Sequence, residues 1–208
     1  MTPTPPSSLP GPRRGVLTAE PVELPRLAGV LTAAFADNPI SDWLFHGEQD
    51  HHHPAFFAAF LRWALRGGRV EQTHDGTAVA IWIDYTIPPG DLLDDFQTEI
   101  LDAVGRHRTR WLTLDHATAN EHPAPPHWWL AFLGVLPTHR GRGAGSALLR
   151  HGAHWQDGQP AYLEATSRRL STYYHHHGYQ PTDTIDVPHG PTLYGMWRDA
   201  APATGGGS

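Results

Sequence analysis

Hydrophobic and polar positions follow two different periods along the chain, which predicts a mixture of helices and strands. Apolar residues recur every three or four positions over residues 24–36 and 54–66, as in amphipathic helices. The Asp-Asn-Pro sequence at 37–39 should end the first of them. Residues 69–73 and 77–85 then predict two strands, and the second is apolar on both faces, as in a central strand.

The most apolar run, residues 128–136, predicts a buried strand that leads through a glycine-rich loop into a helix opening near Ser146. Further strands are expected at 14–19, 161–166, 178–187 and 192–198, and further helices at 91–104, 106–119 and 170–177. The order is β-α-α-β-β-α-(α)-β-α-β-α-β-β, which predicts a mixed α/β or α+β sheet with helices packed on it.

The length of 208 residues and the 39% hydrophobic content suit one domain with its own core, which we place at residues 14–198. Residues 1–13 are rich in proline and serine and are expected to be disordered, and residues 199–208 to form a flexible tail. No apolar run approaches the ~18–20 residues of a membrane span, and the start lacks the apolar segment of a secretory signal. A cytoplasmic protein is therefore expected.

Two residue types are missing and limit the chemistry. The chain has no cysteine and no lysine, so all 15 of its basic residues are arginine. This excludes disulfides, thiolate zinc sites, a cysteine nucleophile, a lysine Schiff base and a Walker-type phosphate loop. The net charge of −6 argues against a nucleic-acid partner, which needs a basic face. Arginine, histidine, carboxylates, hydroxyls and backbone groups must supply the function, or a group brought by a cofactor.

Three glycines at alternate positions, Gly141, Gly143 and Gly145, stand between the buried strand and the following helix. Glycine allows the positive φ angles that turn successive N–H groups into one concavity, and the helix N-terminus adds further donors. Arg140 and Arg142 bring two guanidinium groups to the same place. The pattern predicts a phosphate or pyrophosphate cradle. A tight turn, in which glycine only permits close packing, is the alternative.

Four segments in the second half of the chain carry a family resemblance. They are Leu-Gly-Val-Leu-Pro at 133–137, Arg-Gly-Arg-Gly-Ala-Gly at 140–145, Tyr-Leu-Glu-Ala-Thr at 162–166 and Tyr-Tyr-His-His-His-Gly-Tyr at 173–179. In order and spacing they resemble the GNAT acetyltransferase superfamily, whose acyl-CoA loop reads Gln/Arg-x-x-Gly-x-Gly/Ala. Residues 31–39, 78–82 and 186–191 resemble the branch that contains puromycin N-acetyltransferase.

The resemblance implies a GNAT-like α/β (α+β) fold: a central mixed, mostly antiparallel sheet, splayed at strands four and five, with helices on both faces. Acetyl-CoA would be the cosubstrate and would lie in that splay. The implied cofactor-binding residues are Leu133, Gly134, Val135, Arg140, Gly141, Arg142, Gly143, Ala144, Gly145 and Ser146. One position departs from the family, because Leu170 stands where an asparagine often contacts the cofactor.

Catalysis needs a proton donor for the departing thiolate and a base for the attacking amine. The resemblance assigns the acid to Tyr174, whose neutral phenol can supply a proton, whereas simple packing of the short helix is the alternative. Glu164 is the candidate base, acting through water, and an ion pair with arginine is the alternative role. His127 and His189 are expected to flank the same mouth and titrate in the right range.

The acceptor pocket is expected to use the N-terminal helices: Phe35, Asp37, Pro39, Trp43 and Phe45. Trp129 would stand behind this pocket and His127 at its mouth. Aromatic rings and a carboxylate suit a flat cationic amine, although aromatics at helical spacing also serve as core.

Histidine triplets occur at 51–53 and 175–177, and His151 and His154 are three residues apart. Consecutive helical residues point in different directions, so no metal site is predicted.

The sequence therefore predicts an acetyl-CoA-dependent N-acetyltransferase that acts on the primary amine of a small molecule, such as an aminonucleoside-like or other antibiotic. A protein or peptide N-acetyltransferase and a non-catalytic acyl-CoA-binding module are the alternatives. A monomer or a homodimer is expected.

Overall fold

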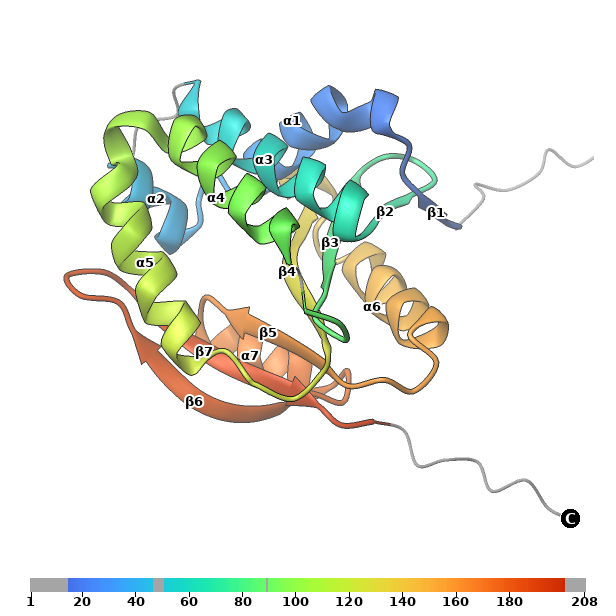
Figure 1. The fold of residues 1–208 in the computed structure, drawn as a ribbon. Coiled ribbons are helices and arrows are strands. Elements are labelled where there is room, and N and C mark those ends of the chain that lie inside the picture. Colours follow the sequence, from blue (N-terminus) through green and yellow to red (C-terminus); the bar gives the residue numbers. More distant parts are fainter. Residues whose placement is uncertain (1–14, 47–50, 89, 201–208) are drawn as a thin grey trace, which may run out of the picture.

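The computed structural model describes residues 15–46, 51–88 and 90–200, and these are built around a seven-stranded sheet (Figure 1). The strand order is β1-β2-β3-β4-β5-β7-β6, and only the β4–β5 pair is parallel. The strands are β1 (Val16–Thr18), β2 (Gly68–Thr73), β3 (Ala78–Asp84), β4 (Trp128–Val135), β5 (Ala161–Ala165), β6 (Gln180–Asp186) and β7 (Thr192–Arg198). The expected mixed, mostly antiparallel sheet is confirmed.

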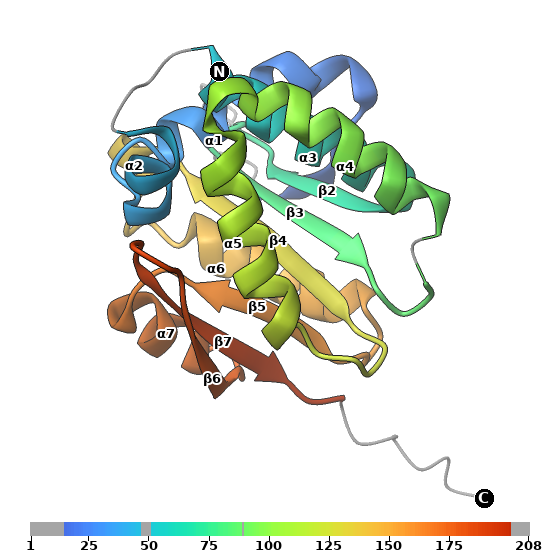
Figure 2. The same cartoon turned by 60° about the vertical axis from the view of Figure 1, so that its left-hand side comes forward.

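Helices cover both faces of this sheet, as predicted (Figures 1 and 2). On one face lie α1 (Leu24–Ala34), α3 (His52–Gly67), α4 (Asp91–Val104) and α5 (Arg108–Glu121), with the short α2 (Pro39–Phe45) at their edge. The other face carries α6 (Ala144–Trp155), which packs on β1 to β4, and α7 (Arg168–His175), which packs on β5 to β7. Short 3₁₀ turns occupy Pro21–Glu23, Gly105–His107 and Pro137–His139.

The hydrophobic pattern explains this layering. The β3 strand is buried from Ala78 to Ile83 because helices cover both of its faces, which is why it has no polar side. Alternate β3 residues enter two separate cores: Ile81 packs under α1 and α3, and Trp82 packs under α6. The predicted elements are found within a few residues of their expected ends.

The α2 helix was not predicted from the sequence. Residues 37–39 do end α1, but Asn38 also begins the next helix, since its side chain accepts a hydrogen bond from the N–H of Ile40 at 2.9 Å. Pro39 occupies the first helical position, where proline is favourable. The helix has seven residues, too few for a clear period.

The β4 and β5 strands part soon after they meet. Only two residue pairs join them among the described residues, Trp128 with Ala161 and Trp129 with Tyr162. On its other side, β4 contains a bulge, because Ile81 pairs with Phe132 whereas Trp82 pairs with Leu130. The extra residue of a bulge bends its strand. The bend carries the rest of β4 away from β5, and the predicted splay is confirmed.

The α5 helix is unusual because it is polar on nearly all sides, with only Trp111 and Leu114 buried. A helix at the surface of a core normally has a broad apolar stripe. The α5 helix packs on β6 and follows α4, and both views place it over the β5–β7 half of the sheet (Figures 1 and 2). Its polar residues therefore face something other than core.

The predicted disordered segment 1–13 lies outside the described residues, as do residues 201–208 of the predicted tail. Within the part of the chain that is described, no helix has the length and apolar character needed to cross a membrane.

A pair of helix-interior glycines tests the packing of α6 on the sheet. A Cβ at Gly152 would lie 2.6 Å from the Trp82 ring, whereas one at Gly29 on α1 would meet nothing within 4 Å. We expect Gly152→Ala to lower the free energy of unfolding by about 1–3 kcal/mol through overpacking. The matched Gly29→Ala should raise it by about 0.5–1 kcal/mol through helix propensity. Urea unfolding measures both, and equal effects of the two changes would contradict this packing.

Candidate active site

The part of β4 beyond the splay has one open edge. Leu133, Gly134 and Val135 pair with β3 on one side, and no described strand pairs with them on the other. A Cβ at Gly134 would lie 2.8 Å from Leu31 and 3.1 Å from Ala34, so α1 packs closely against this residue. Gly134 therefore presents only its backbone at this open edge. A strand with an open edge can accept an extended ligand by backbone hydrogen bonds.

The glycine loop ends at the N-terminus of α6, an arrangement that can bind an anion. Gly141 and Gly143 have φ angles of +75° and +86°, which glycine adopts without strain. The first bonded N–H of the helix belongs to Ala147, which donates to Gly143 O at 2.9 Å. The N–H groups just before it have no acceptor within the helix, and the helix dipole adds positive potential there. The loop fits a pyrophosphate group.

The guanidinium of Arg140 is paired with Asp37. It donates to both carboxylate oxygens at 2.8 Å and to Ala34 O at 2.7 Å. These bonds lower the pKa of Asp37 and raise that of Arg140. Two predicted site residues, one expected to bind the acceptor and one the cofactor, are thus bonded to each other. The pair holds the glycine loop against the α1–α2 turn.

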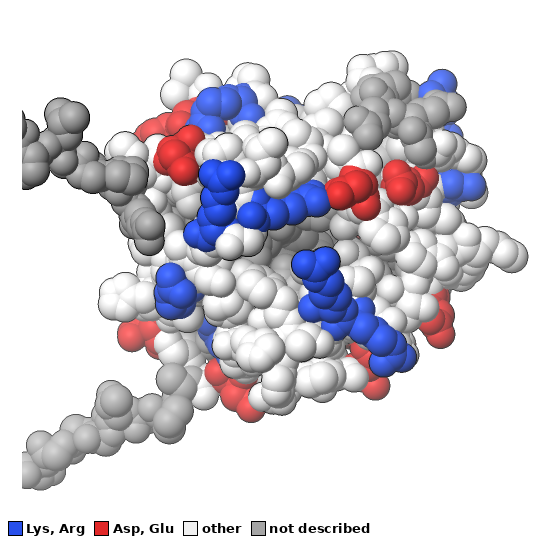
Figure 3. Space-filling model, turned by 180° about the vertical axis from the view of Figure 1, so that it is seen from behind, with Lys and Arg blue, Asp and Glu red and all other residues white. Residues whose placement is uncertain are grey.

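Other arginines remain exposed on the face that carries α6 and α7. Figure 3 shows arginine side chains around a hollow on the side opposite to the view of Figure 1. The exposed arginines of the loop, α6 and α7 are Arg142, Arg150, Arg168 and Arg169. Permanent positive charges there favour a ligand with several phosphate groups.

Ser146 connects α6 to α7. Its Oγ lies 3.2 Å from the Tyr173 hydroxyl and 3.0 Å from His177 Nε2. A Cβ at Gly145 would lie 2.9 Å from the same Tyr173 hydroxyl, so the third glycine of the loop makes room for tyrosine. Leu170, the residue that departs from the family pattern, is exposed on α7.

Tyr174 is the buried residue of α7 and packs in the core between the sheet and the helices α6 and α7, with 8% of its surface exposed. Its ring lies 5.3 Å from Tyr173 and 6.0 Å from Tyr179, measured between centroids. Burial raises the pKa of Tyr174 well above its ordinary value of 10. The phenol therefore keeps its proton at neutral pH, as a proton donor must.

On the other face of the sheet, beside the point where β4 and β5 part, lies the carboxyl group of Glu164. Its Oε2 accepts a hydrogen bond from Trp129 Nε1 at 2.8 Å, and the side chain is 9% exposed. Its Oε1 is buried and accepts no hydrogen bond from the described residues. Burial raises the pKa of Glu164 from 4.5 to about 7, because a charge is poorly solvated there. This carboxyl exchanges its proton near neutral pH.

Two histidines continue from Glu164. His122 Nδ1 lies 3.9 Å from Glu164 Oε1, and His122 Nε2 lies 3.2 Å from His127 Nε2. His127 Nδ1 lies 2.7 Å from Pro125 O. Burial lowers the pKa of His122 to about 4 and also lowers that of His127, so both rings are neutral at pH 7. Of these two histidines, only His127 was predicted from the sequence to lie at the site.

Two tyrosines complete this cluster. Tyr85 stacks on His127 with ring centroids 5.6 Å apart, and the hydroxyl of Tyr162 is buried beside Glu164. Burial and the charge of Glu164 raise the pKa of Tyr85 to about 12 and raise that of Tyr162 further. Both phenols are therefore protonated around Glu164 at neutral pH.

The residues predicted for the acceptor pocket lie in separate places. Trp129 and His127 belong to the Glu164 cluster, but Phe35 packs in the core against Phe57 and Phe132. Trp43 lies at the β6–β7 turn, where its Nε1 donates to His189 O at 2.7 Å. Phe45 is fully buried, and Pro39 is exposed at the start of α2. No ring contact among the described residues joins Phe35 or Trp43 to Trp129.

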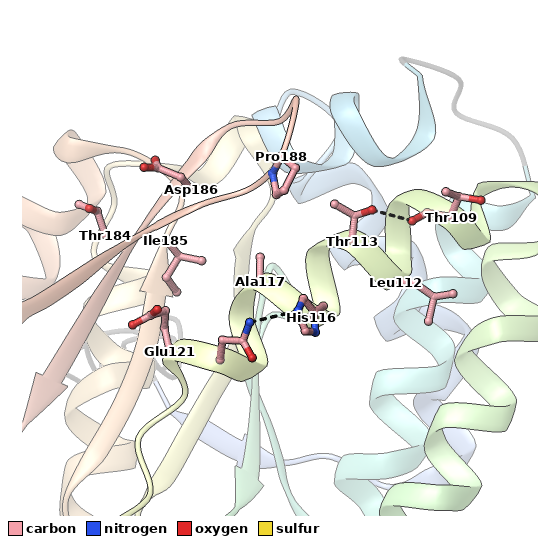
Figure 4. A pocket seen from close by; sticks show the side chains of 11 residues that line it. Thr109, Leu112, Thr113, His116, Ala117, Glu121, Thr184, Ile185, Asp186 and Pro188 are labelled. Atoms are coloured by element: carbon pink, nitrogen blue, oxygen red, sulfur yellow. Dashed lines mark hydrogen bonds between the residues drawn. The ribbon is translucent and has the colours of Figure 1, made fainter.

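A groove of about 680 Å³, which was not predicted from the sequence, lies between α5 and β6 (Figure 4). Its two walls carry hydroxyl, amide, imidazole and carboxyl groups, which explains why α5 has no apolar stripe. The lining residues are Thr109, Leu112, Thr113, His116, Ala117, Asn120 and Glu121 of α5, with Thr184, Ile185, Asp186 and Pro188. The polar pattern of α5 was the available signal, but its partner β6 follows about 60 residues later in the chain.

The described histidines and carboxylates do not form a metal site. No group of three or more such side chains within residues 15–46, 51–88 and 90–200 is arranged to hold an ion.

Comparisons with known proteins agree with this geometry. Residues 106–181 match the family model described as an acetyltransferase (GNAT) domain. A Corynebacterium glutamicum structure, described as a histone acetyltransferase and related acetyltransferase, has a TM-score of 0.67 and 27% sequence identity. That alignment covers 92% of this chain and 98% of the other.

Two insect enzymes share the fold at lower identity. The polyamine N-acetyltransferase of Drosophila melanogaster has a TM-score of 0.63 at 17% identity, over 89% of this chain and 99% of the other. Arylalkylamine N-acetyltransferase 2 of Aedes aegypti has a TM-score of 0.63 at 16% identity, over 90% and 99%.

Residues 106–181 thus match a GNAT acetyltransferase domain, and the sheet with its parallel, splayed β4–β5 pair has the GNAT fold. The protein is an acetyltransferase. Domains of this kind take the acetyl group from acetyl-CoA, and the open edge of β4, the glycine loop and the exposed arginines fit that molecule.

The raised pKa of Glu164 predicts a pH-dependent contribution to stability. This contribution is fully present below 4.5 and is lost as the pH rises through about 7, because only the folded state disfavours the ionised form. Since one pKa unit corresponds to about 1.4 kcal/mol, the loss amounts to about 3 kcal/mol.

Glu164→Gln should therefore raise the free energy of unfolding at pH 8, relative to the wild type, by about 3 kcal/mol more than at pH 4.5. Urea unfolding at both pH values measures this difference. If the effect of Glu164→Gln on the free energy of unfolding is the same at both pH values, the pKa of Glu164 is not raised by folding.

Proposed function

We propose that the protein is an acetyl-CoA-dependent N-acetyltransferase that acetylates the primary amine of a small molecule directly, with no acetyl-enzyme intermediate. The observation that carries the proposal is the buried Glu164 carboxyl, whose pKa of about 7 suits a general base, beside the splay of β4 and β5. The absence of cysteine is consistent with direct transfer.

Backbone groups would make most of the contacts with acetyl-CoA. The open edge of Leu133–Val135 would bind the pantetheine amides, and the N–H groups of residues 141–146 would bind the pyrophosphate. Arg142 is free to contact phosphate, whereas Arg140 would act by holding the loop in place. Acetyl-CoA supplies the thioester that is transferred.

Each reacting proton has a residue assigned to it. Glu164 would take a proton from the ammonium group of the acceptor, directly or through one water, so that the neutral amine can attack. Tyr174 would donate the proton that the departing sulfur needs, because its buried phenol is neutral at pH 7. The two groups lie on opposite faces of the sheet, and the splay between them gives the acetyl group a place to meet both.

The α5–β6 groove is our proposed acceptor site. Glu121 and Asp186 provide negative charge for a cationic amine, and threonine hydroxyls on both walls suit a hydroxylated molecule. Trp43 lies beside Gly190, next to the Pro188 end of the groove, where its ring could contact a flat base.

A flat, hydroxylated amine is the chemistry of an aminonucleoside. The resemblance of residues 186–191 to the puromycin N-acetyltransferase branch supports this choice, since Asp186 and Pro188 line the groove. We therefore propose an antibiotic of this kind as the substrate. Small amines are also acceptors for neighbours of the same fold, which are described as acting on polyamines and arylalkylamines.

The reaction is tested by release of free thiol from acetyl-CoA in the presence of an aminonucleoside, a polyamine, an arylalkylamine or a lysine peptide. We expect the aminonucleoside to give the highest kcat/KM, and a preference for the peptide would point to a protein acetyltransferase. Binding of acetyl-CoA without turnover of any amine would indicate a binding module.

Two substitutions separate the base from the acid. Glu164→Gln should lower kcat by about 10²–10⁴-fold, and Tyr174→Phe should lower kcat with little change in acetyl-CoA affinity. Tyr179→Phe is the matched control, because this buried tyrosine has a hydroxyl without a hydrogen-bond partner among the described residues. Equal activity of the Tyr174 and Tyr179 variants would remove Tyr174 from the acid role.

The groove is tested separately by removing its charge. Glu121→Gln and Asp186→Asn should each raise KM for the cationic amine about 5–10-fold, corresponding to about 1 kcal/mol of lost attraction, and leave KM for acetyl-CoA unchanged. The control is Asp94→Asn, which removes the same charge from an exposed residue of α4. Unchanged KM values in both groove variants would place the acceptor elsewhere.

A further inference from the structure

The two histidines next to Glu164 take no part in the mechanism above, although their geometry is specific. His122 follows the end of α5, His127 precedes β4, and Glu164 lies on β5. Three segments of the chain thus meet at one row of side chains. Whether these three side chains can transfer a proton depends on which of their atoms carry protons.

The hydrogen-bond partners determine the proton positions. Pro125 O can only accept, so the 2.7 Å contact requires that His127 Nδ1 carry the proton. In a neutral ring, His127 Nε2 then has a lone pair, and the 3.2 Å contact requires His122 Nε2 to donate. His122 Nδ1 is left with a lone pair, and it faces Glu164 Oε1 at 3.9 Å.

The two oxygens of Glu164 are therefore not equivalent. Oε2 accepts from Trp129, whereas Oε1 faces a basic nitrogen and makes no hydrogen bond of normal geometry with the described residues; the nearby Tyr162 phenol also lowers the pKa of this carboxyl. A carboxylate that takes a proton on Oε1 can pass it to His122 Nδ1, directly after a small movement or through one water across the 3.9 Å. The His122 side chain is 16% exposed, so the proton can continue to solvent.

The reaction needs such an exit. When R–NH₃⁺ is acetylated, a C–N bond forms, a C–S bond breaks and the nitrogen loses two protons. One of them ends on the thiol, and the other must leave. A base buried as deeply as Glu164 cannot start another cycle until it has released its proton.

We propose that His122 is a positioning residue that makes Oε1 of Glu164 the protonation site and passes its proton to solvent, with His127 fixing the tautomer of His122. The inference rests on the proposed function, because it assumes Glu164 as the base. Other titratable groups also face this row from the packed elements. They are Tyr85 after β3, Asp115 and Glu121 on α5, Tyr162 on β5 and Asp183 on β6.

The first test does not need activity. The Trp129 indole N–H donates to Glu164, so its NMR resonance reports the titration of that carboxyl in the folded protein. In His122→Asn, an amide N–H can donate to Oε1 and stabilise the carboxylate, and the midpoint should fall by at least about half a pH unit. His154→Asn on α6, an exposed histidine, is the control and should leave the midpoint unchanged. An unchanged midpoint in His122→Asn would overturn the proposal.

The second test measures turnover. His122→Asn should lower kcat about tenfold and move the acidic limb of its pH profile, with KM for acetyl-CoA unchanged. In His122→Ala, added imidazole at constant pH should restore turnover at least threefold by accepting the proton, and it should have no effect on the wild type. If imidazole fails to restore turnover in His122→Ala while Glu164→Gln is inactive, His122 does not pass the proton, but the proposed function still holds. A wild type inactive on every amine would remove the proposed function, and the indole titration would still decide the contact between His122 and Glu164.

Discussion

The brief pairing of β4 with β5 is the constraint on which the rest of the structure depends. Two residue pairs join these strands, and the bulge opposite Ile81 and Trp82 then bends β4 away. Past this point no described strand pairs with β4 on the β5 side, so its backbone groups are open there. The glycine loop lies at one end of the opening because it directly continues β4 into α6.

The same parting of the strands creates the electrostatics of the site. Glu164 follows the last paired residues of β5, so its side chain has neither the full packing of a core position nor the water of a surface position. A carboxyl in such a place binds its proton more tightly, and here this brings its pKa to about 7. The neighbouring histidines and tyrosines are neutral for the same reason.

Several features could be predicted from local sequence because they depend on neighbours along the chain. The periods of α1 and α3, the apolar β3 and β4 strands, and the glycines before α6 are of this kind. The family resemblance added the splay of the sheet, and the structure and the GNAT domain match confirm that level of the prediction. The branch and the individual site residues stay at the level of proposal.

What the sequence determined by itself was the order of elements, the helix N-terminus with its glycines, and the absence of cysteine and lysine chemistry. Only the tertiary structure decided which side chains meet. It paired Arg140 with Asp37, about 100 residues apart, brought His122 to Glu164, and formed a groove from α5 and β6. Hydrophobic periodicity shows which face of an element is buried, but it does not show which element packs there. The type of a polar residue does not identify its distant hydrogen-bond partner.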